Sequence, residues 1–190
     1  MGFLDALLGK RKIKGPAPDR LFAITTAAIA LDAGPGIRPR GAAAIVFQPL
    51  ATGDFAQIVS EMEEVVRGTG EETGTTLTTS DDTYGYRWMV LHDDDVEDLA
   101  VGINAVSDAL EVGGYGNRVL CAVFAFQTSD GTPVYFIYNY KRGTWYPFVP
   151  AGGEQQRSTE RELQIKAQIG AELPIEQELE RWFPLWGIPI

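Results

Sequence analysis

Two apolar stretches separated by a short polar turn place the strongest constraint on the fold of this chain. Val119–Gln127 and residues 133–140 are rich in valine and aromatic side chains, and Asp130-Gly131 stands between them. An Asp-Gly pair in this position is a strong signal of a β-hairpin, because the turn needs residues that tolerate a positive φ. A third stretch, Thr144–Phe148, follows a short turn at residues 141–143. The sequence therefore predicts three consecutive antiparallel strands.

Strands and helices are also predicted ahead of this hairpin. Hydrophobic residues recur at helical spacing in residues 54–67, and acidic residues open a second helix over 93–112. Strands are predicted at residues 41–48, 75–79 and 84–92, and a polar loop at 68–74. Short turns between consecutive strands favour an α+β fold, in which helices pack against an antiparallel sheet. The order strand–strand–helix recurs loosely along the chain, which also fits a domain built of two loosely related halves.

Helix signals at the two ends of the chain are weaker. Asp19 can cap a helix over residues 19–26, whereas residues 27–33 fit either a helix or a strand. Thr159 and Glu162 have the spacing of a capping box, which predicts a helix over 159–173. Pro174 then begins a predicted helix that ends at Arg181.

Length and charge restrict the class of protein. A chain of 190 residues fits an amphipathic N-terminal helix and basic linker over 1–18, followed by a single α+β domain over 19–190. The net charge of −10 argues against a nucleic-acid partner, which requires clustered Lys and Arg. One cysteine fits a reducing compartment, and no apolar run is long enough to predict a membrane span. We therefore expect a soluble, cytoplasmic protein.

The first fourteen residues combine an apolar face with a basic cluster. Two helical turns are too short to be stable alone in water, so this segment is expected to pack on the protein, on a partner or on a lipid surface. A basic cluster near anionic lipid contributes about 1 kcal/mol per residue, so peripheral contact with the inner face of the cell membrane stays open. The candidate interaction residues are Phe3, Leu4, Leu7 and Leu8 on the apolar face, and Lys10, Arg11 and Lys12 behind it.

Few residues are candidates for catalysis. The only histidine, His92, and the only cysteine, Cys121, could form a thiolate–imidazole pair. Cys121 lies in a strand that is apolar on both faces, however, where a cysteine normally acts as a small buried hydrophobic residue. With one His and one Cys, the usual zinc ligand sets are not available. The sequence therefore predicts no catalytic residue, no metal site and no cofactor.

A second candidate surface surrounds the turn at residues 141–143. Strand alternation places Tyr138, Tyr140 and either Trp145 or Tyr146 on shared faces beside Lys141 and Arg142. Aromatic residues next to cationic residues are common in binding surfaces, although cross-strand packing beside a solvated turn explains the same pattern. Tyr140, Lys141, Arg142, Trp145 and Tyr146 are accordingly candidates for contact with a partner or a small molecule.

The C-terminus is unusually apolar for a chain end. Trp182, Phe183 and Trp186 lie within the last nine residues. Chain ends are generally polar and poorly ordered unless they dock on the domain. The sequence predicts that these three side chains are largely buried against the sheet or the preceding helix.

Four segments spread over the whole chain resemble one known family. They are MGFLDALLG at 1–9, YGYRW at 84–88, YKRGTWYPF at 140–148 and RWFPLWG at 181–187. Together and in this order they resemble PspAB, a family of proteins associated with phage shock protein A in actinobacteria and some archaea. Phage shock protein A is the coiled-coil protein that coats and protects stressed inner membrane.

The resemblance implies a non-enzymatic cytoplasmic accessory role in the envelope-stress system of phage shock protein A. It implies a phage shock protein A-like partner and supplies no catalytic residues. The alternative is a small-molecule-binding or enzymatic domain that uses an aromatic and basic pocket near Lys141 and Arg142. Partner binding predicts a flat apolar patch at that turn, whereas the alternative predicts a deep polar pocket there.

Overall fold

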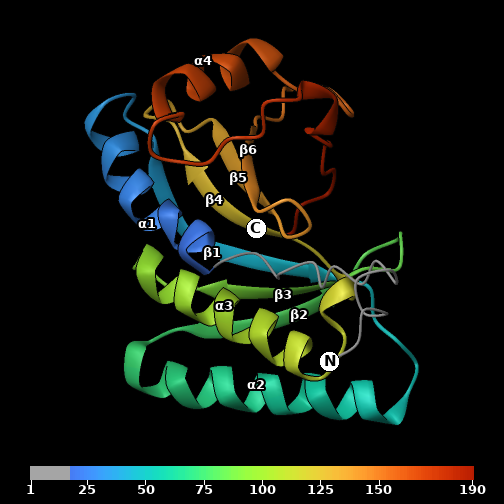
Figure 1. The fold of residues 1–190 in the computed structure, drawn as a ribbon. Coiled ribbons are helices and arrows are strands. Elements are labelled where there is room, and N and C mark those ends of the chain that lie inside the picture. The colour runs from blue at the N-terminus through green and yellow to red at the C-terminus, as the bar shows by residue number, and fades with distance from the viewer. Residues whose placement is uncertain (1–17) are drawn as a thin grey trace, which may run out of the picture.

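The computed structural model describes residues 18–190, and these residues form an antiparallel sheet with helices packed against it (Figure 1). The α+β class is therefore confirmed. The six strands of this sheet stand in the order β2-β3-β1-β4-β5-β6. Their bounds are β1 (Arg38–Phe47), β2 (Thr76–Asp81), β3 (Arg87–His92), β4 (Val119–Gln127), β5 (Pro133–Asn139) and β6 (Thr144–Phe148).

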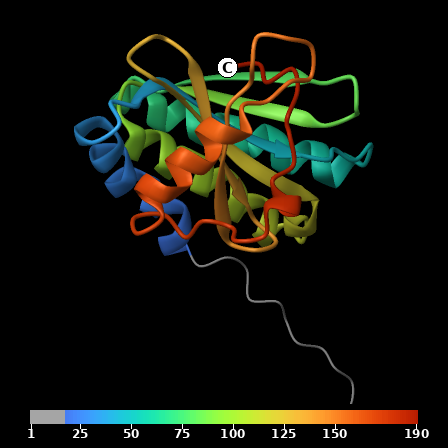
Figure 2. The same ribbon diagram turned by 90° about the horizontal axis from the view of Figure 1, so that it is seen from above.

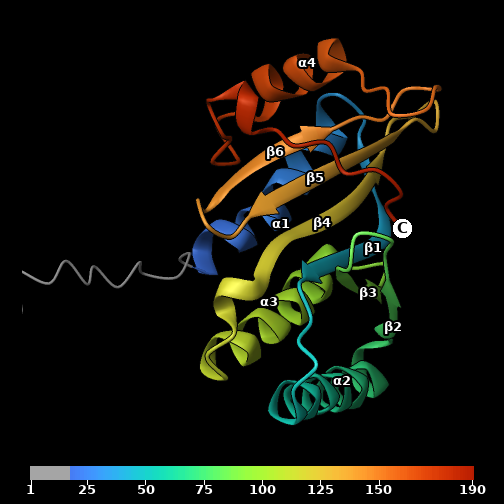
Figure 3. The same ribbon diagram turned by 90° about the vertical axis from the view of Figure 1, so that its right-hand side faces the viewer.

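The helices are α1 (Pro18–Ala33), α2 (Gly53–Thr73), α3 (Val96–Val112) and α4 (Thr159–Ile169), with short 3-10 turns η1 (Gly116–Arg118) and η2 (Leu179–Arg181). α3 packs between α1 and α2 and also contacts β1 and β3. α2 lies beside β2 and α4 beside β6, so these two helices stand at opposite ends of the sheet (Figures 1 and 3). The predicted helix at 1–9 and the basic linker behind it lie outside the described residues.

The half of the sheet formed by β4, β5 and β6 is covered on both faces. Trp145 Nε1 donates a hydrogen bond of 2.7 Å to the Arg20 carbonyl of α1, whereas Tyr146 Oη donates one of 3.0 Å to the Phe183 carbonyl. Neighbouring side chains of a strand point to opposite faces. The C-terminal segment therefore lies on the face opposite α1 (Figure 2). This double coverage explains why the β4 sequence is apolar at every position but its last.

α2 is longer than the sequence predicts. The helix continues to Thr73 and ends at Gly74, which has φ 93°, so the predicted loop at 68–74 is wrong. The carbonyl of Thr75 approaches Gly70 so closely that an added Cβ at Gly70 would lie 2.0 Å from its oxygen. Only a residue without a side chain permits this approach, so Gly70 serves the close turn at the end of a helix and does not mark a loop.

The ends of the chain also differ from prediction. Residues 27–33, which fit a helix or a strand, complete α1. The capping box is wrong, because the helix begins after Ser158 and Glu162 points its carboxylate at the end of β6, where Oε1 accepts a hydrogen bond of 2.9 Å from Val149 N. The predicted helix over 174–181 is also wrong. Within that range only Leu179–Arg181 forms a 3-10 turn.

Candidate functional site

The structure separates the candidate residues of the 140–146 segment into buried aromatic rings and more exposed cations. Tyr140, Trp145 and Tyr146 are buried, whereas Lys141 is exposed. The Tyr138 ring lies 5.0 Å from the rings of both Tyr140 and Trp145, which confirms the predicted shared face. Trp145 occupies that face, and Tyr146 occupies the opposite one. The aromatic side chains therefore pack inside the domain.

Arg142 is held by an ion pair with Glu176. Arg142 Nε contacts Oε2 of this carboxylate, and Thr144 Oγ1 donates a hydrogen bond of 3.2 Å to the same oxygen. Burial of Glu176 opposes its ionisation, but the hydrogen bonds from Arg142, the Glu178 amide and Thr144 hold its pKa below the usual value. The guanidinium thus anchors the segment that follows α4, and Lys141 is the exposed cation of the turn.

The segment after α4 also closes the outer edge of β6. Trp145 N donates to the Pro174 carbonyl at 2.9 Å, and Glu176 N donates to the Trp145 carbonyl at 2.8 Å. An edge strand with unpaired backbone groups is a site of unwanted pairing. The short contact between residues 174–176 and β6 satisfies both backbone groups of Trp145 and covers this part of the edge.

The C-terminal segment docks mainly through Trp182. This side chain is only 4% exposed, stacks on Tyr146 with ring centroids 6.2 Å apart, and donates through Nε1 to the Glu176 carbonyl at 3.0 Å. The prediction of burial is confirmed for Trp182. It is wrong for Phe183, whose residue is 60% exposed. Phe183 contacts the domain through its backbone carbonyl, which accepts the hydrogen bond from Tyr146 Oη, and not through its ring. Trp186 is half-buried, with its ring 5.2 Å from Phe148.

An open apolar groove lies on the other side of the molecule, along the seam between α2 and α3. Its main cavity has a volume of about 290 Å³, and a smaller cavity of about 60 Å³ continues it towards Leu91. We call this surface the α2–α3 groove. The residues that line its main cavity are Ile58, Glu61, Met62, Val65, Val66, Ala105, Val106, Ala109, Val112 and Gly113.

Apolar side chains remain exposed along this groove. Val112 is 89% exposed and Val101, which lines the smaller cavity, is 47% exposed. Exposed apolar surface that forms a continuous concave strip is typical of a binding site. The sequence carried a signal for it, because residues 101, 105, 109 and 112 form a second apolar stripe on α3 beside the core stripe of Leu99, Ile103, Val106 and Leu110.

Negative charge borders the groove. α2 contains six acidic residues and one basic residue, Arg67, and α3 contains four acidic residues and none that are basic. The two helices thus carry a net charge of −9, against −10 for the entire chain. Glu61 and Asp98 line the groove itself. An apolar floor with acidic borders is complementary to an apolar segment flanked by cations.

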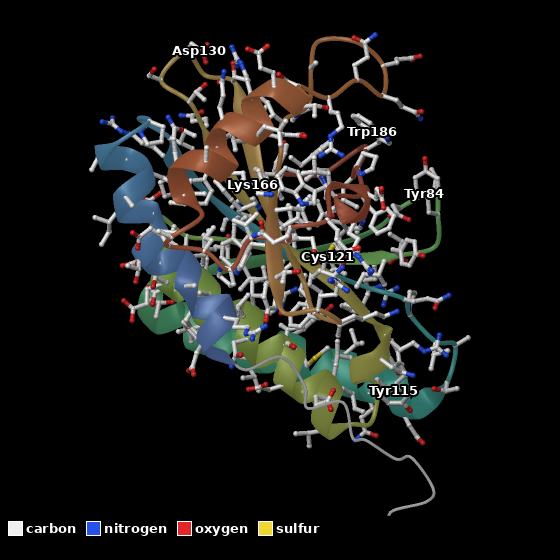
Figure 4. All side chains as sticks on the ribbon, turned by 45° about the horizontal axis from the view of Figure 1, so that its top comes forward. Tyr84, Tyr115, Cys121, Asp130, Lys166 and Trp186 are labelled. Carbon is white, nitrogen blue, oxygen red and sulfur yellow. The ribbon has the colours of Figure 1, made fainter. Side chains whose placement is uncertain are left out.

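The two candidate groups for nucleophilic catalysis are far apart. The β1 register places Ala42 beside His92 and Val46 beside Cys121, and four residues of a strand span about 13 Å. Cys121 lies among the packed side chains, whereas Tyr84 stands at the periphery (Figure 4). Burial raises the pKa of the Cys121 thiol to about 12. The prediction that Cys121 is a buried hydrophobic residue is confirmed.

Within residues 18–190, no group of three or more His, Cys, Asp or Glu side chains is arranged to hold a metal ion. None of the helices in this range is long and apolar enough to cross a bilayer.

Comparison with known proteins identifies the family. The model of the PspAB family, described as PspA associated protein B, matches residues 1–190. No curated protein and no solved structure matches the chain. The match covers all four segments on which the resemblance was based, and it covers the α2–α3 groove and the docked C-terminus as well. The chain therefore belongs to the PspAB family.

Proposed function

We propose that this protein is a non-enzymatic cytoplasmic accessory protein of the envelope-stress system built on phage shock protein A. It acts by binding a PspA-like protein through the α2–α3 groove. The family description supplies the association with PspA. The observation that carries the proposal is the groove, because it is an open apolar cavity of about 290 Å³ on a domain whose aromatic side chains are mostly buried.

A groove between two helices fits a third helix. Amphipathic helices bind such grooves through apolar anchors at positions i, i+3, i+4 and i+7. From Val101 to Val112 the wall formed by α3 is about 17 Å long, which accommodates about three turns of a partner helix. A coiled-coil partner consists of helices of this kind. The acidic borders favour a partner helix with Lys or Arg beside its apolar stripe.

The test compares two exposed apolar residues on different surfaces. Val112→Asn removes an anchor from the groove without changing charge, and Ile29→Asn makes the same type of change on α1, where Ile29 is 72% exposed. Full burial of a Val side chain is worth about 1.5–3 kcal/mol, so Val112→Asn should weaken binding to a purified PspA-like protein about 10- to 100-fold. Ile29→Asn should bind as the wild type does.

Isothermal titration calorimetry at two salt concentrations gives the affinities. Wild-type affinity for Val112→Asn, or an equal loss in both variants, would refute the groove as the binding surface. Binding should weaken at higher salt because part of the attraction crosses the acidic border.

Membrane contact, where it occurs, belongs to the basic N-terminal residues. The acidic helices that border the groove are repelled by anionic lipid, whereas Lys10, Arg11 and Lys12 are attracted to it. Replacing these three residues with Gln should abolish sedimentation with anionic liposomes at low salt and leave binding to neutral liposomes unchanged. Equal sedimentation of the wild type and the triple variant would remove this segment from membrane binding.

A further inference from the structure

We infer that, in the free protein, residues 3–8 of the chain itself occupy the α2–α3 groove. The inference deepens the proposed function, since it concerns regulation of the same surface. It rests on three observations that are independent of any partner, namely the apolar lining of the groove, the charge of its borders, and the distance from the groove to the first described residue.

The apolar match comes from the size and spacing of the side chains. In helical conformation, Phe3, Leu4, Leu7 and Leu8 form one face of two turns. A helix of this length is not stable in water without a surface on which to pack. The groove is such a surface, because its floor is made of Ile, Met, Val and Ala side chains and Val112 is left almost fully exposed.

The charge of the groove borders supports the same placement. Residues 1–14 carry four basic residues against Asp5, a net charge of +3, on a chain that is otherwise strongly acidic. The two helices that border the groove carry most of that acidic charge. A segment that places Leu7 and Leu8 in the groove also places Lys10, Arg11 and Lys12 near these acidic helices. Ile29 on α1 lines a separate hollow together with Asp32, Asp94, Asp95 and Glu97, so acidic borders occur there as well. That hollow is also lined by threonine side chains, whereas the floor of the α2–α3 groove is more continuously apolar.

The connection is long enough for this placement. α1 begins at Pro18 and packs directly on α3, which forms one wall of the groove. Packed helices lie about 8–10 Å apart, so the seam beyond α3 is about 15 Å from α1. The nine residues 9–17 span up to about 30 Å when extended. The linker is therefore long enough for the segment to reach the groove of its own molecule.

Occupation by residues 3–8 makes the groove selective. A partner helix must displace the segment, so apolar helices that bind only weakly are excluded. The affinity of the protein for its partner is therefore lower than the affinity that an empty groove would have. Anionic lipid competes for the same basic residues, which ties exposure of the groove to the presence of a membrane surface.

The experiment uses the full-length protein and no partner, so its outcome is separate from the test of PspA binding. A photo-crosslinking residue, p-benzoylphenylalanine, replaces Val112 in one variant and Ile29 in another. After irradiation and proteolysis, mass spectrometry should find fragments of residues 1–9 joined to position 112 and not to position 29. Adding Leu7→Ser and Leu8→Ser should lower the yield at position 112 about tenfold or more, because each change removes a buried side chain.

A dilution series identifies the occupant. The yield at position 112 should be independent of protein concentration and should fall at high salt. A yield that rises with concentration would assign the segment to a second copy and overturn the inference. Absence of crosslinks to residues 1–9, or equal yields at positions 112 and 29, would also overturn it. Absence of crosslinks, or equal yields at the two positions, would still leave the groove available to a PspA-like helix, so neither result would refute the proposed function.

Discussion

Arg157 and Glu162 form a buried ion pair that joins three parts of the fold. Arg157 Nε lies 3.0 and 2.9 Å from the two carboxylate oxygens of Glu162, whose side chain is only 1% exposed. The same carboxylate accepts a hydrogen bond from Val149 at the end of β6, and Arg157 Nη1 donates one of 2.5 Å to the Trp182 carbonyl. One pair of charges therefore links the sheet edge, α4 and the C-terminal segment.

Glu162→Gln should destabilise the protein by about 3 kcal/mol, because it leaves the charge of Arg157, whose side chain is 21% exposed, without its counter-ion. Urea unfolding followed by tryptophan fluorescence measures the change in the free energy of unfolding. Glu160→Gln is the matched control on the exposed side of the same helix and should change stability by less than about 0.5 kcal/mol. Equal effects of the two variants would contradict a structural role for the pair.

Trp182→Ala and Phe183→Ala should differ sharply although the residues are neighbours. Loss of a buried Trp typically costs about 3–5 kcal/mol, and Trp182 additionally supplies a buried hydrogen bond to Glu176. The exposed Phe183 ring should contribute less than about 0.5 kcal/mol. Thermal unfolding of the two variants provides the measurement. A Trp182→Ala midpoint equal to that of the wild type would mean that the C-terminal segment does not stabilise the domain.

Acid should weaken the Arg142–Glu176 anchor. The pKa of Glu176 is lowered in the folded state, whereas a Glu in the unfolded chain has a pKa of about 4.3. Its contribution to stability is therefore complete above the unfolded pKa and is lost as pH falls through the folded pKa. Urea midpoints between pH 5 and pH 3 should fall less steeply in Glu176→Gln than in the wild type. The exposed control Glu172→Gln should follow the wild-type curve, and identical slopes in all three proteins would argue against this linkage.

Two glycines of α2 should respond oppositely to Ala. At Gly68 an added Cβ meets nothing within 4 Å, so Gly68→Ala should stabilise by about 0.5–1 kcal/mol through helix propensity. At Gly70 the Cβ would collide with the Thr75 carbonyl, and Gly70→Ala should destabilise despite the same gain in propensity. Urea denaturation measures both changes. Stabilisation by Gly70→Ala would show that the turn into β2 is looser than described.

The Cys121 thiol should be unreactive in the folded protein. Its pKa of about 12 leaves almost no thiolate at pH 8, and its side chain is buried. Ellman's reagent should react with one thiol per chain in 6 M guanidinium chloride and with almost none in native buffer. Rapid labelling of the native protein would indicate that β4 opens readily.

Local patterns located several elements closely. β4 and β6 have the predicted bounds, because alternating or continuous apolar residues between turn signals are properties of a few neighbouring residues. The end of α2 and the segment after α4 were mispredicted for a different reason. α2 ends at Gly74 in the left-handed conformation and not at the earlier glycines, and the extended residues 174–176 pair with the backbone of Trp145, which is distant in the sequence.

The candidate site shows the same limit. Alternation placed Tyr138 and Tyr140 on one face together with either Trp145 or Tyr146. It could not reveal that Trp145 is the one, or that α1 covers this face. The second apolar stripe on α3, which includes Val101 and Val112, was visible in the sequence but resembled ordinary core packing. Its exposure became evident only from the placement of α2 along α3.

The α+β class, the positions of most strands, the uneven charge and the family can all be read from the sequence. These properties depend on residue type and on spacings of two to four residues, which act locally. Which apolar faces are covered depends on how the elements pack in three dimensions. This packing buries Tyr146 and Trp182 against each other and leaves Val112 open, because coverage depends on segments that are distant in the chain and meet only in the folded protein.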